Sequence, residues 1–284
     1  KAPDSPMTFR HVLSHSGGLT YGATNHPVDK VYRRIGVNRD RNETLSTFME
    51  RIGQTPLRYE PGTAWLYSLS TDVCGGLVEA ISGMPFDEYL QKNIFDPLEM
   101  ADTSFWVAPE KQKRFDANYQ RNPDKTLKLI DDPERSAYLT KPGFFSGGGG
   151  LTSTTADYLR FCDFLLRQGE RNGVRLLSPR TVDYMTRNHL PGGSDLAGYA
   201  RSMFAETAYA GVGFGLGFSV VVDPAANKVL TSPGTFSWGG AASTGFYVDP
   251  VEEVTALFMT QLLPSSTWPL RSQLTQLVSQ AILA

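Results

Sequence analysis

Two short segments of the chain hold groups suited to acid–base and acyl-transfer chemistry. The first contains Tyr67, which follows a turn at Glu60-Pro61-Gly62 and precedes a helix cap at Ser70. A tyrosine at this rigid corner either packs against Trp65 or, beside a cation that stabilises its phenolate, acts as a base. Tyr67 is therefore a candidate catalytic residue.

The second segment is centred on Trp238-Gly239-Gly240. Paired glycines are unusual inside a strand. They indicate either a bulge that packs against a helix or a strand whose backbone N–H groups, around Ala241, face a ligand. Two N–H groups directed at one oxygen form an oxyanion hole, so this segment is the second candidate site.

The histidines are weaker candidates. His11 and His15 have the spacing of two metal ligands on one helix face. No third ligand follows them, however, and Val12 stands where a zinc-protease helix carries glutamate. We interpret both as structural and predict no metal site. His26 and His189 are possible members of a Ser-His-Asp triad, but no serine lies in the G-x-S-x-G pattern of a hydrolase nucleophile.

The glycine run Gly147–Gly150 has only a superficial likeness to a phosphate-binding loop. It lacks the Lys-Ser/Thr pair that contacts phosphate and magnesium in such loops. We expect a tight loop that leads into a helix at Ser153, with close backbone packing at the border of a cleft.

Composition excludes several classes of protein. The 284 residues include 27 lysines and arginines against 29 acidic residues, a net charge of −2 that argues against nucleic-acid binding. The hydrophobic content of 40% is sufficient for a packed core. No run of about 18 apolar residues could span a membrane. Cys74 and Cys162 read as buried thiols and leave the compartment open.

The elements that must position these groups follow from periodicity and capping. We expect helices over 9–15, from Ser70 to Gly83, from Pro85, over 154–169 and from Ser178 to about 185. Residues 107–142 indicate a long polar surface excursion. Alternation predicts strands over 211–218, 236–248 and 253–262, and a last helix over 270–282 that covers the sheet. The predicted division is a mostly helical domain over 1–190 and part of an α/β domain over 191–284.

Four segments together resemble one family. They are MTFRHVLSHSGGLTYG, EPGTAWLYSLSTDVCGGLVEAISGMPFDEYL, FSGGGGLTSTTADYLRF and SWGGAASTGFYVDP. The chain is similar from about Met7 onward to the serine β-lactamase-like family, with the class C β-lactamase and DD-peptidase fold. It most resembles the family VIII carboxylesterases. The resemblance implies an α+β fold, with a helical domain beside an antiparallel sheet flanked by helices, here without its N-terminal portion.

The resemblance also implies roles for the two candidate segments. Tyr67-Ser68-Leu69 stands at the family's Tyr-x-Asn motif, so Tyr67 would take the proton of the nucleophile, while Leu69 departs from the asparagine of β-lactamases. Trp238-Gly239-Gly240 stands at the third motif, Lys/His-x-Gly in β-lactamases. Leu69 and these three residues would contact substrate, and the N–H of Ala241 would bind the substrate oxygen. Because Trp238 carries no charge for a carboxylate, an uncharged small-molecule ester is favoured over a β-lactam.

The family's first motif, Ser-x-x-Lys, supplies the nucleophile, and none of the nine lysines follows a serine by three residues. We therefore expect the nucleophile on an upstream segment, as continuous polypeptide or as a separate chain, and expect this chain alone to be inactive. No cofactor is expected. The alternatives are a β-lactam hydrolase or acyltransferase of the same family, and a non-catalytic binding protein that kept the fold.

Overall fold

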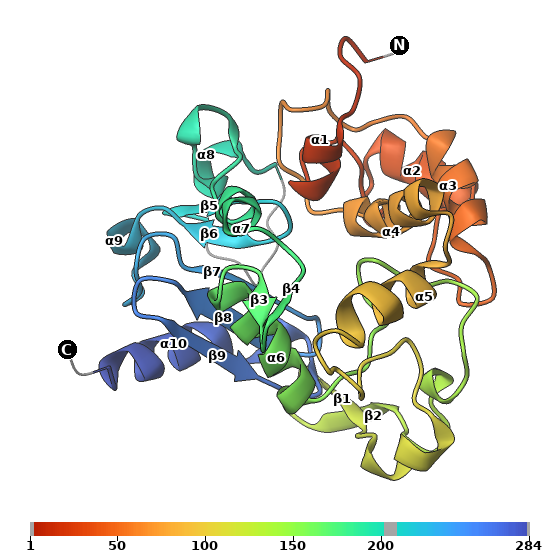
Figure 1. The fold of residues 1–284 in the computed structure, drawn as a ribbon. Helices are drawn as coiled ribbons and strands as arrows, with labels where there is room; N and C mark the ends of the chain where they lie inside the picture. Colours follow the sequence, from red (N-terminus) through yellow and green to blue (C-terminus); the bar gives the residue numbers. More distant parts are fainter. Residues whose placement is uncertain (1–2, 202–208, 283–284) are drawn as a thin grey trace.

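A five-stranded antiparallel sheet forms one half of the fold (Figure 1). The computed structural model describes residues 3–201 and 209–282. The strand order is β5-β6-β7-β8-β9. The strands are β5 (Val212–Phe214), β6 (Ser219–Val221), β7 (Phe236–Gly239), β8 (Gly245–Asp249) and β9 (Val254–Phe258).

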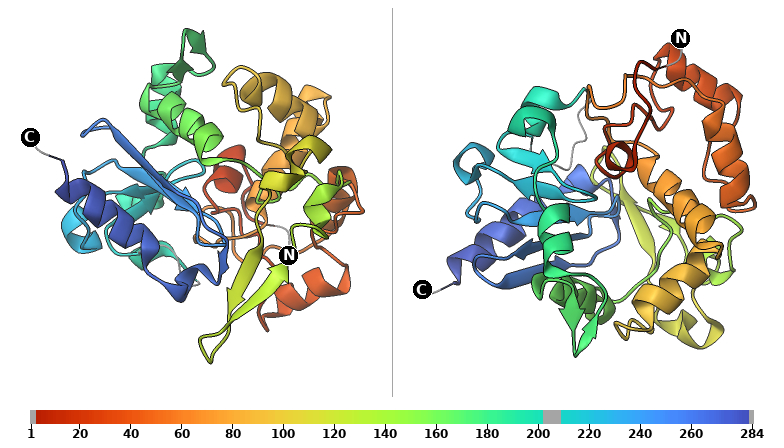
Figure 2. Two further views of the ribbon diagram at one scale, coloured as in Figure 1. Left: turned by 90° about the horizontal axis from the view of Figure 1, so that it is seen from below. Right: turned by 45° about the horizontal axis from the view of Figure 1, so that its top comes forward.

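Helices cover both faces of this sheet (Figure 2). Helix α6 (Thr155–Leu166) packs against β8 and β9 on one face, and α10 (Leu270–Gln280) packs against the same strands on the other. Successive side chains of β8 point to opposite faces of the sheet. Phe246 and Val248 enter the apolar cluster beneath α6, while Tyr247 faces the space beside α10. The predicted covering role of the last helix is confirmed.

The other half is helical. Its elements are α1 (Phe9–Leu13), α2 (Pro27–Arg34), α3 (Leu45–Gly53), α4 (Ser70–Ser82) and α5 (Phe86–Leu90), which continues as a π-helical turn over Gln91–Phe95. These helices share a buried apolar cluster that includes Phe48, Val73 and Phe105. Three short helices lie nearer the sheet: α7 (Pro179–Met185), α8 (Leu196–Tyr199) and α9 (Pro224–Asn227).

Local capping signals predicted helix ends well. The side chains of Thr8, Thr154 and Ser178 each accept a backbone N–H at the start of a helix. Gly83 ends α4 with φ of 68°, a left-handed conformation that favours glycine. The first helix is shorter than expected and ends at Leu13. The helices at 70–83 and 154–169 are confirmed within a few residues.

Residues 107–142, predicted as a polar surface excursion, contain regular secondary structure. It contains a hairpin of β1 (Asn118–Arg121) and β2 (Leu127–Asp131), and β10 (Leu262–Leu263) pairs with β1 in parallel. The apolar side chains of the hairpin are largely exposed, Leu127 by 60%, so they give no clear amphipathic signal. A smaller hairpin joins β3 (Glu170–Arg171) to β4 (Val174–Arg175).

Two predicted strands are wrong in their extent. The segment 236–248 is the hairpin of β7 and β8, because the N–H of Gly240 bonds to the carbonyl of Thr244 at 3.1 Å and turns the chain back. The segment 211–218 supplies only β5, since Gly215 donates to Phe218 at 2.7 Å in a second turn. At Gly215 the backbone packs so closely that a Cβ would collide with the carbonyl oxygen of Met185.

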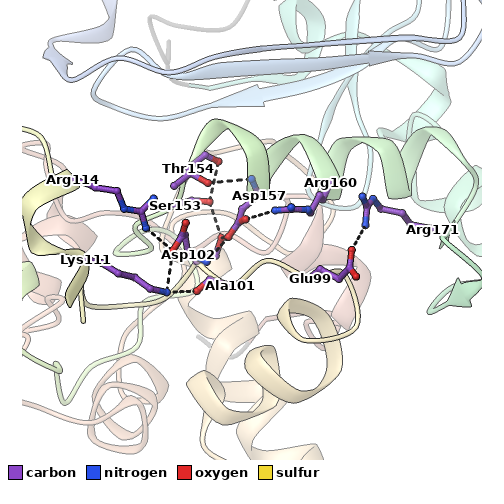
Figure 3. Close-up of polar contacts among 11 residues, drawn as sticks. Glu99, Ala101, Asp102, Lys111, Arg114, Ser153, Thr154, Asp157, Arg160 and Arg171 are labelled. Carbon is purple, nitrogen blue, oxygen red and sulfur yellow. Dashed lines mark hydrogen bonds and ion pairs between the residues drawn. The ribbon is translucent and has the colours of Figure 1, made fainter. Parts of the chain in front are cut away.

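A polar network fastens the start of α6 to the loop that follows the π-helical turn (Figure 3). Asp157 accepts the N–H of Asp102 at 2.6 Å and pairs with Arg160 at 2.6 Å. Asp102 in turn pairs with Arg114 and Lys111, which lower the pKa of its carboxyl to about 2. Because α6 lies against the sheet, residues before 190 pack with residues after it. The predicted division at 190 stays a prediction.

Within 3–201 and 209–282, no helix is long and apolar enough to cross a bilayer.

Candidate active site

One open cavity brings the two candidate segments together, although they are far apart in sequence. Its volume is about 450 Å³. Tyr67 lines it from the helical half, and the run from Trp238 to Ala241 lines it from the end of β7. The remaining described lining residues are Thr20, Tyr21, Ala23, Thr24, Arg39, Arg58, Leu66 and Gly148. The structure thus places five of the six predicted site residues around a single space.

The segment before α4 is held on both sides, which fixes the position of Tyr67. The N–H of Gly62 bonds to the carbonyl of Ser16 at 2.8 Å, and that of Leu66 bonds to His15 at 2.9 Å. On the other side, the N–H of Trp65 bonds to the carbonyl of Tyr199 at 3.2 Å. The expected rigid corner is present, and Tyr67 lies half-buried between the buried residues Leu66 and Ser68.

Aromatic rings surround Tyr67. Ring centroids lie at 4.8 Å for His15, 5.3 Å for Trp238 and 5.4 Å for Tyr21. Burial strongly raises the pKa of the Tyr21 hydroxyl, and the adjacent Tyr67 raises it further. Tyr21 is therefore a neutral phenol in the working pH range. The expected stacking on Trp65 is also present, with centroids 6.2 Å apart.

The glycines after Trp238 lie where the strand ends. A Cβ on Gly239 would displace the guanidinium of Arg271 from α10, which donates to the carbonyls of Gly240 and Thr244. The N–H of Gly240 is used within the hairpin. Ala241 is exposed in the following turn, and its N–H has no hydrogen-bond acceptor among the described residues. The N–H of Ala241 is therefore the backbone donor after β7 that could bind the carbonyl oxygen of a substrate.

Leu69 lies apart from the other predicted residues. It is 3% exposed, belongs to the apolar cluster of the helical half and stands at the N-cap of α4. The described cavity lining does not include it. At this place in the fold the side chain supports the helix rather than the cavity wall.

The glycine loop after Phe145 rests on the start of α4. Asp72, in the first turn of that helix, is fully buried and accepts the Ser146 hydroxyl and, at 3.2 Å, the N–H of Gly148. Burial raises the pKa of this carboxyl, an effect opposed by Ser146 and by the nearby Arg39. The loop therefore borders the cavity through Gly148, as the sequence indicated.

Replacing Gly147 by alanine should destabilise the protein by about 1–3 kcal/mol. Its Cβ would overlap the carbonyl oxygen of Thr71 and lie 2.9 Å from the carbonyl carbon, and backbone cannot move aside as a side-chain tip can. Gly149→Ala is the matched control, because its Cβ would meet nothing nearer than 3.6 Å. Urea unfolding measures the stability of both variants. Equal unfolding free energies for the two variants would contradict this account of the loop.

Two arginines of the wall were missed by the sequence analysis. Arg39 comes from the loop between α2 and α3, and its guanidinium lies 5.6 Å from the ring centre of Tyr21. Arg58 pairs with the buried Asp29 at 3.5 Å. Neither arginine lies in a motif, and both come to the cavity only through tertiary packing. The sequence analysis considered only the uncharged Trp238 when it weighed the charge of the pocket.

The histidines do not form a site in the structure. Because α1 ends at Leu13 and His15 has φ of 53°, His11 and His15 do not share a helix face. His26 caps α2, and Nε2 of His189 bonds to the carbonyl of Tyr184 at 2.7 Å. In the part of the chain that the structure describes, no three His, Cys, Asp or Glu side chains gather as metal ligands would.

The chain belongs to the Beta-lactamase family, whose pattern matches residues 1–280. The family and the fold expected from the motifs are thereby confirmed. Protein Rv1367c of Mycobacterium tuberculosis is 34% identical over 91% of this chain and 63% of its own length. Esterase EstB of Burkholderia gladioli is 28% identical over 89% of this chain and 64% of its own.

Solved structures support the same fold. Simvastatin Synthase (LovD) from Aspergillus terreus shares the fold with a TM-score of 0.77 and 26% identity, over 99% of this chain and 69% of that one. Further relatives bear the names of esterases and acyltransferases. The chain spans about 63–64% of the length of the two curated relatives described above.

Proposed function

We propose that the full-length protein is a serine hydrolase that cleaves carboxylic esters through an acyl-enzyme. The observation that carries this proposal is the shared cavity, in which Tyr67 faces the space bordered by Trp238, Gly239, Gly240 and Ala241. A phenolic group and a backbone N–H without an acceptor among the described residues are the two groups that acyl transfer requires beside a nucleophile. The relationship to esterases supports the same reaction.

The proposed steps give each group one role. In its phenolate form, Tyr67 accepts the proton of the nucleophilic serine as the serine oxygen bonds to the ester carbonyl carbon. The N–H of Ala241 donates to the carbonyl oxygen while that oxygen gains negative charge. Tyr67 then returns the proton to the departing alkoxide, and water repeats the sequence to release the acid. Trp238 offers an apolar wall to the uncharged part of the substrate.

We assign the nucleophile to polypeptide outside residues 1–284. No serine of the sequence stands three residues before a lysine, which is the arrangement that activates the nucleophile in this family. The curated relatives are longer than the matched region, which leaves room for such a segment. In this proposal residues 1–284 alone do not form an acyl-enzyme.

Acyl transfer to an alcohol is the second candidate. It differs only in the acceptor of the acyl group, and a relative 28% identical over 98% of this chain is named a Monacolin J acid methylbutanoyltransferase. The cavity is open, so an alcohol can reach the acyl group as water does. A third candidate, of another class, is a non-catalytic protein that binds a ligand with the same fold.

Turnover by the full-length protein tests the proposal. We expect hydrolysis of 4-nitrophenyl butyrate with a much higher kcat/KM than that for the β-lactam nitrocefin, because the uncharged Trp238 stands at the place on β7 where β-lactamases carry the cation for the β-lactam carboxylate. Methanol added as acceptor would reveal acyl transfer as methyl butyrate. Faster turnover of nitrocefin would contradict the preference for esters, and binding without turnover of either compound would favour the binding protein.

A further inference from the structure

The charge of the cavity wall is strongly one-sided. Among its described lining residues are two guanidinium groups, those of Arg39 and Arg58, and no aspartate or glutamate. The chain as a whole has a net charge of −2, so this balance is a local feature. A wall of this kind favours an anionic ligand.

The two arginines are not equivalent. Arg58 is largely buried, and Asp29 neutralises it at 3.5 Å. Arg39 has no carboxylate within 4 Å among the described residues, and its side chain is exposed at the cavity. An anion that enters the cavity would therefore find the uncompensated positive charge of the cavity wall at Arg39.

The backbone beside Arg39 is anchored, and its side chain rests against an aromatic ring. Arg41, two residues later, donates to the carbonyl of Ala137 at 2.8 Å, and its own carbonyl accepts the N–H of Gly143 at 2.6 Å, so the loop is anchored. The guanidinium rests 5.6 Å from the ring centre of Tyr21, a cation–π distance. A held guanidinium loses less conformational entropy when it binds a carboxylate.

The nearest acid does not cancel this charge. Asp72 lies beyond ion-pair distance of Arg39, is fully buried and already accepts bonds from Ser146 and Gly148. Its burial favours the neutral carboxyl, as the direction of its pKa shift indicates. Tyr21 also stays neutral, so the positive charge of Arg39 remains available to a ligand.

We propose that Arg39 is an anion-binding subsite and that the preferred substrates are esters bearing a second, free carboxylate. This inference deepens the proposed function and rests on it, because a bound anion is a substrate only if the protein hydrolyses esters. The guanidinium would bind the carboxylate while the ester carbonyl lies between Tyr67 and the N–H of Ala241. The bidentate pairing of guanidinium and carboxylate provides both affinity and orientation.

A binding test on the full-length protein needs no turnover. The probes are 5-oxohexanoate, whose ketone stands in for the ester carbonyl, and the neutral isostere 5-oxohexanamide. We expect the anion to bind about tenfold more tightly, a typical effect for one charge-assisted hydrogen bond. This ratio should fall toward one in Arg39→Met and with added salt.

Matched variants separate local from general charge. Arg34→Met removes one exposed positive charge from α2 outside the described cavity lining, and should keep the tenfold ratio. Arg39→Lys should retain part of it. A ratio near one in the unmodified protein, or a ratio that Arg39→Met leaves unchanged, would overturn the subsite.

Kinetics then separate this inference from the proposed function. The substrate pair is mono-(4-nitrophenyl) glutarate and its neutral amide counterpart, 4-nitrophenyl 4-carbamoylbutanoate. Binding preference through Arg39 without hydrolysis of either ester would support the subsite and refute the hydrolase. Hydrolysis of both at equal kcat/KM, with no preference in binding, would support the hydrolase and refute the subsite.

Discussion

In a Tyr67→Phe variant of the full-length protein, we expect kcat for ester hydrolysis to fall by about 10²–10⁴-fold, the usual contribution of a general acid–base group. The variant keeps the ring that contacts Trp238 and Tyr21 and loses only the hydroxyl. The aromatic packing should persist, so stability should change little. Steady-state hydrolysis of 4-nitrophenyl butyrate measures the effect, with urea unfolding as the check on folding.

Tyr21→Phe is the matched control for that variant. Tyr21 lines the same cavity, and its ring lies 5.4 Å from that of Tyr67, but its raised pKa keeps it protonated and unsuited to accept a proton. We expect a reduction of at most about tenfold, the effect of one hydrogen bond. If Tyr21→Phe abolished turnover and Tyr67→Phe left kcat intact, the roles assigned to the two tyrosines would be wrong.

The second large effect is on stability in acid, through His15. This side chain is 2% exposed, and burial lowers its pKa to about 3. Its Nδ1 lies 3.5 Å from the hydroxyl of Ser68, and the rings of Trp65, Tyr67 and Phe214 surround it. No carboxylate among these neighbours could stabilise the protonated imidazole.

The direction follows from proton binding. The unfolded chain protonates this histidine below about pH 6.5, whereas the folded protein does so only near pH 3. Between these values the unfolded state holds more protons, so stability falls as the pH falls. The loss is about 2 kcal/mol by pH 5 and about 5 kcal/mol in full.

Urea unfolding at pH 8 and pH 5 measures this loss against a His15→Asn variant. Asparagine tolerates the left-handed φ of 53° at this position, and it does not titrate. Other groups, including His11 and Asp72, act equally in both proteins and cancel in the difference. A wild-type loss no larger than that of the variant would show that His15 is not held neutral.

Local signals explain most of what the sequence predicted correctly. Thr8, Thr154 and Ser178 cap helices through bonds to residues only three positions away, so the caps are visible in sequence. Tyr67 and the Trp238 segment were found from turn and glycine patterns and from their family motifs. Their convergence on one cavity depends on tertiary packing, which those patterns do not contain.

The errors have the same physical origin. In sequence, a glycine pair is compatible with a bulge and with the end of a strand. The hydrogen bond from the N–H of Gly240 to the carbonyl of Thr244 forms the hairpin turn here. Arg39 and Arg58 look like ordinary surface charges in sequence, yet packing against Tyr21 and Asp29 brings them to the cavity. Leu69 stands beside Tyr67 in the motif, but the start of α4 turns it into the core.

Labelling with a serine-reactive fluorophosphonate tests most directly whether this cavity serves an acyl-enzyme whose nucleophile lies elsewhere in the polypeptide. The full-length protein is treated with the probe, its intact mass is measured, and the modified peptide is mapped. We predict one adduct, on a serine outside residues 1–284, and a much slower reaction in Tyr67→Phe. An adduct on a serine within residues 1–284 would contradict the central claim.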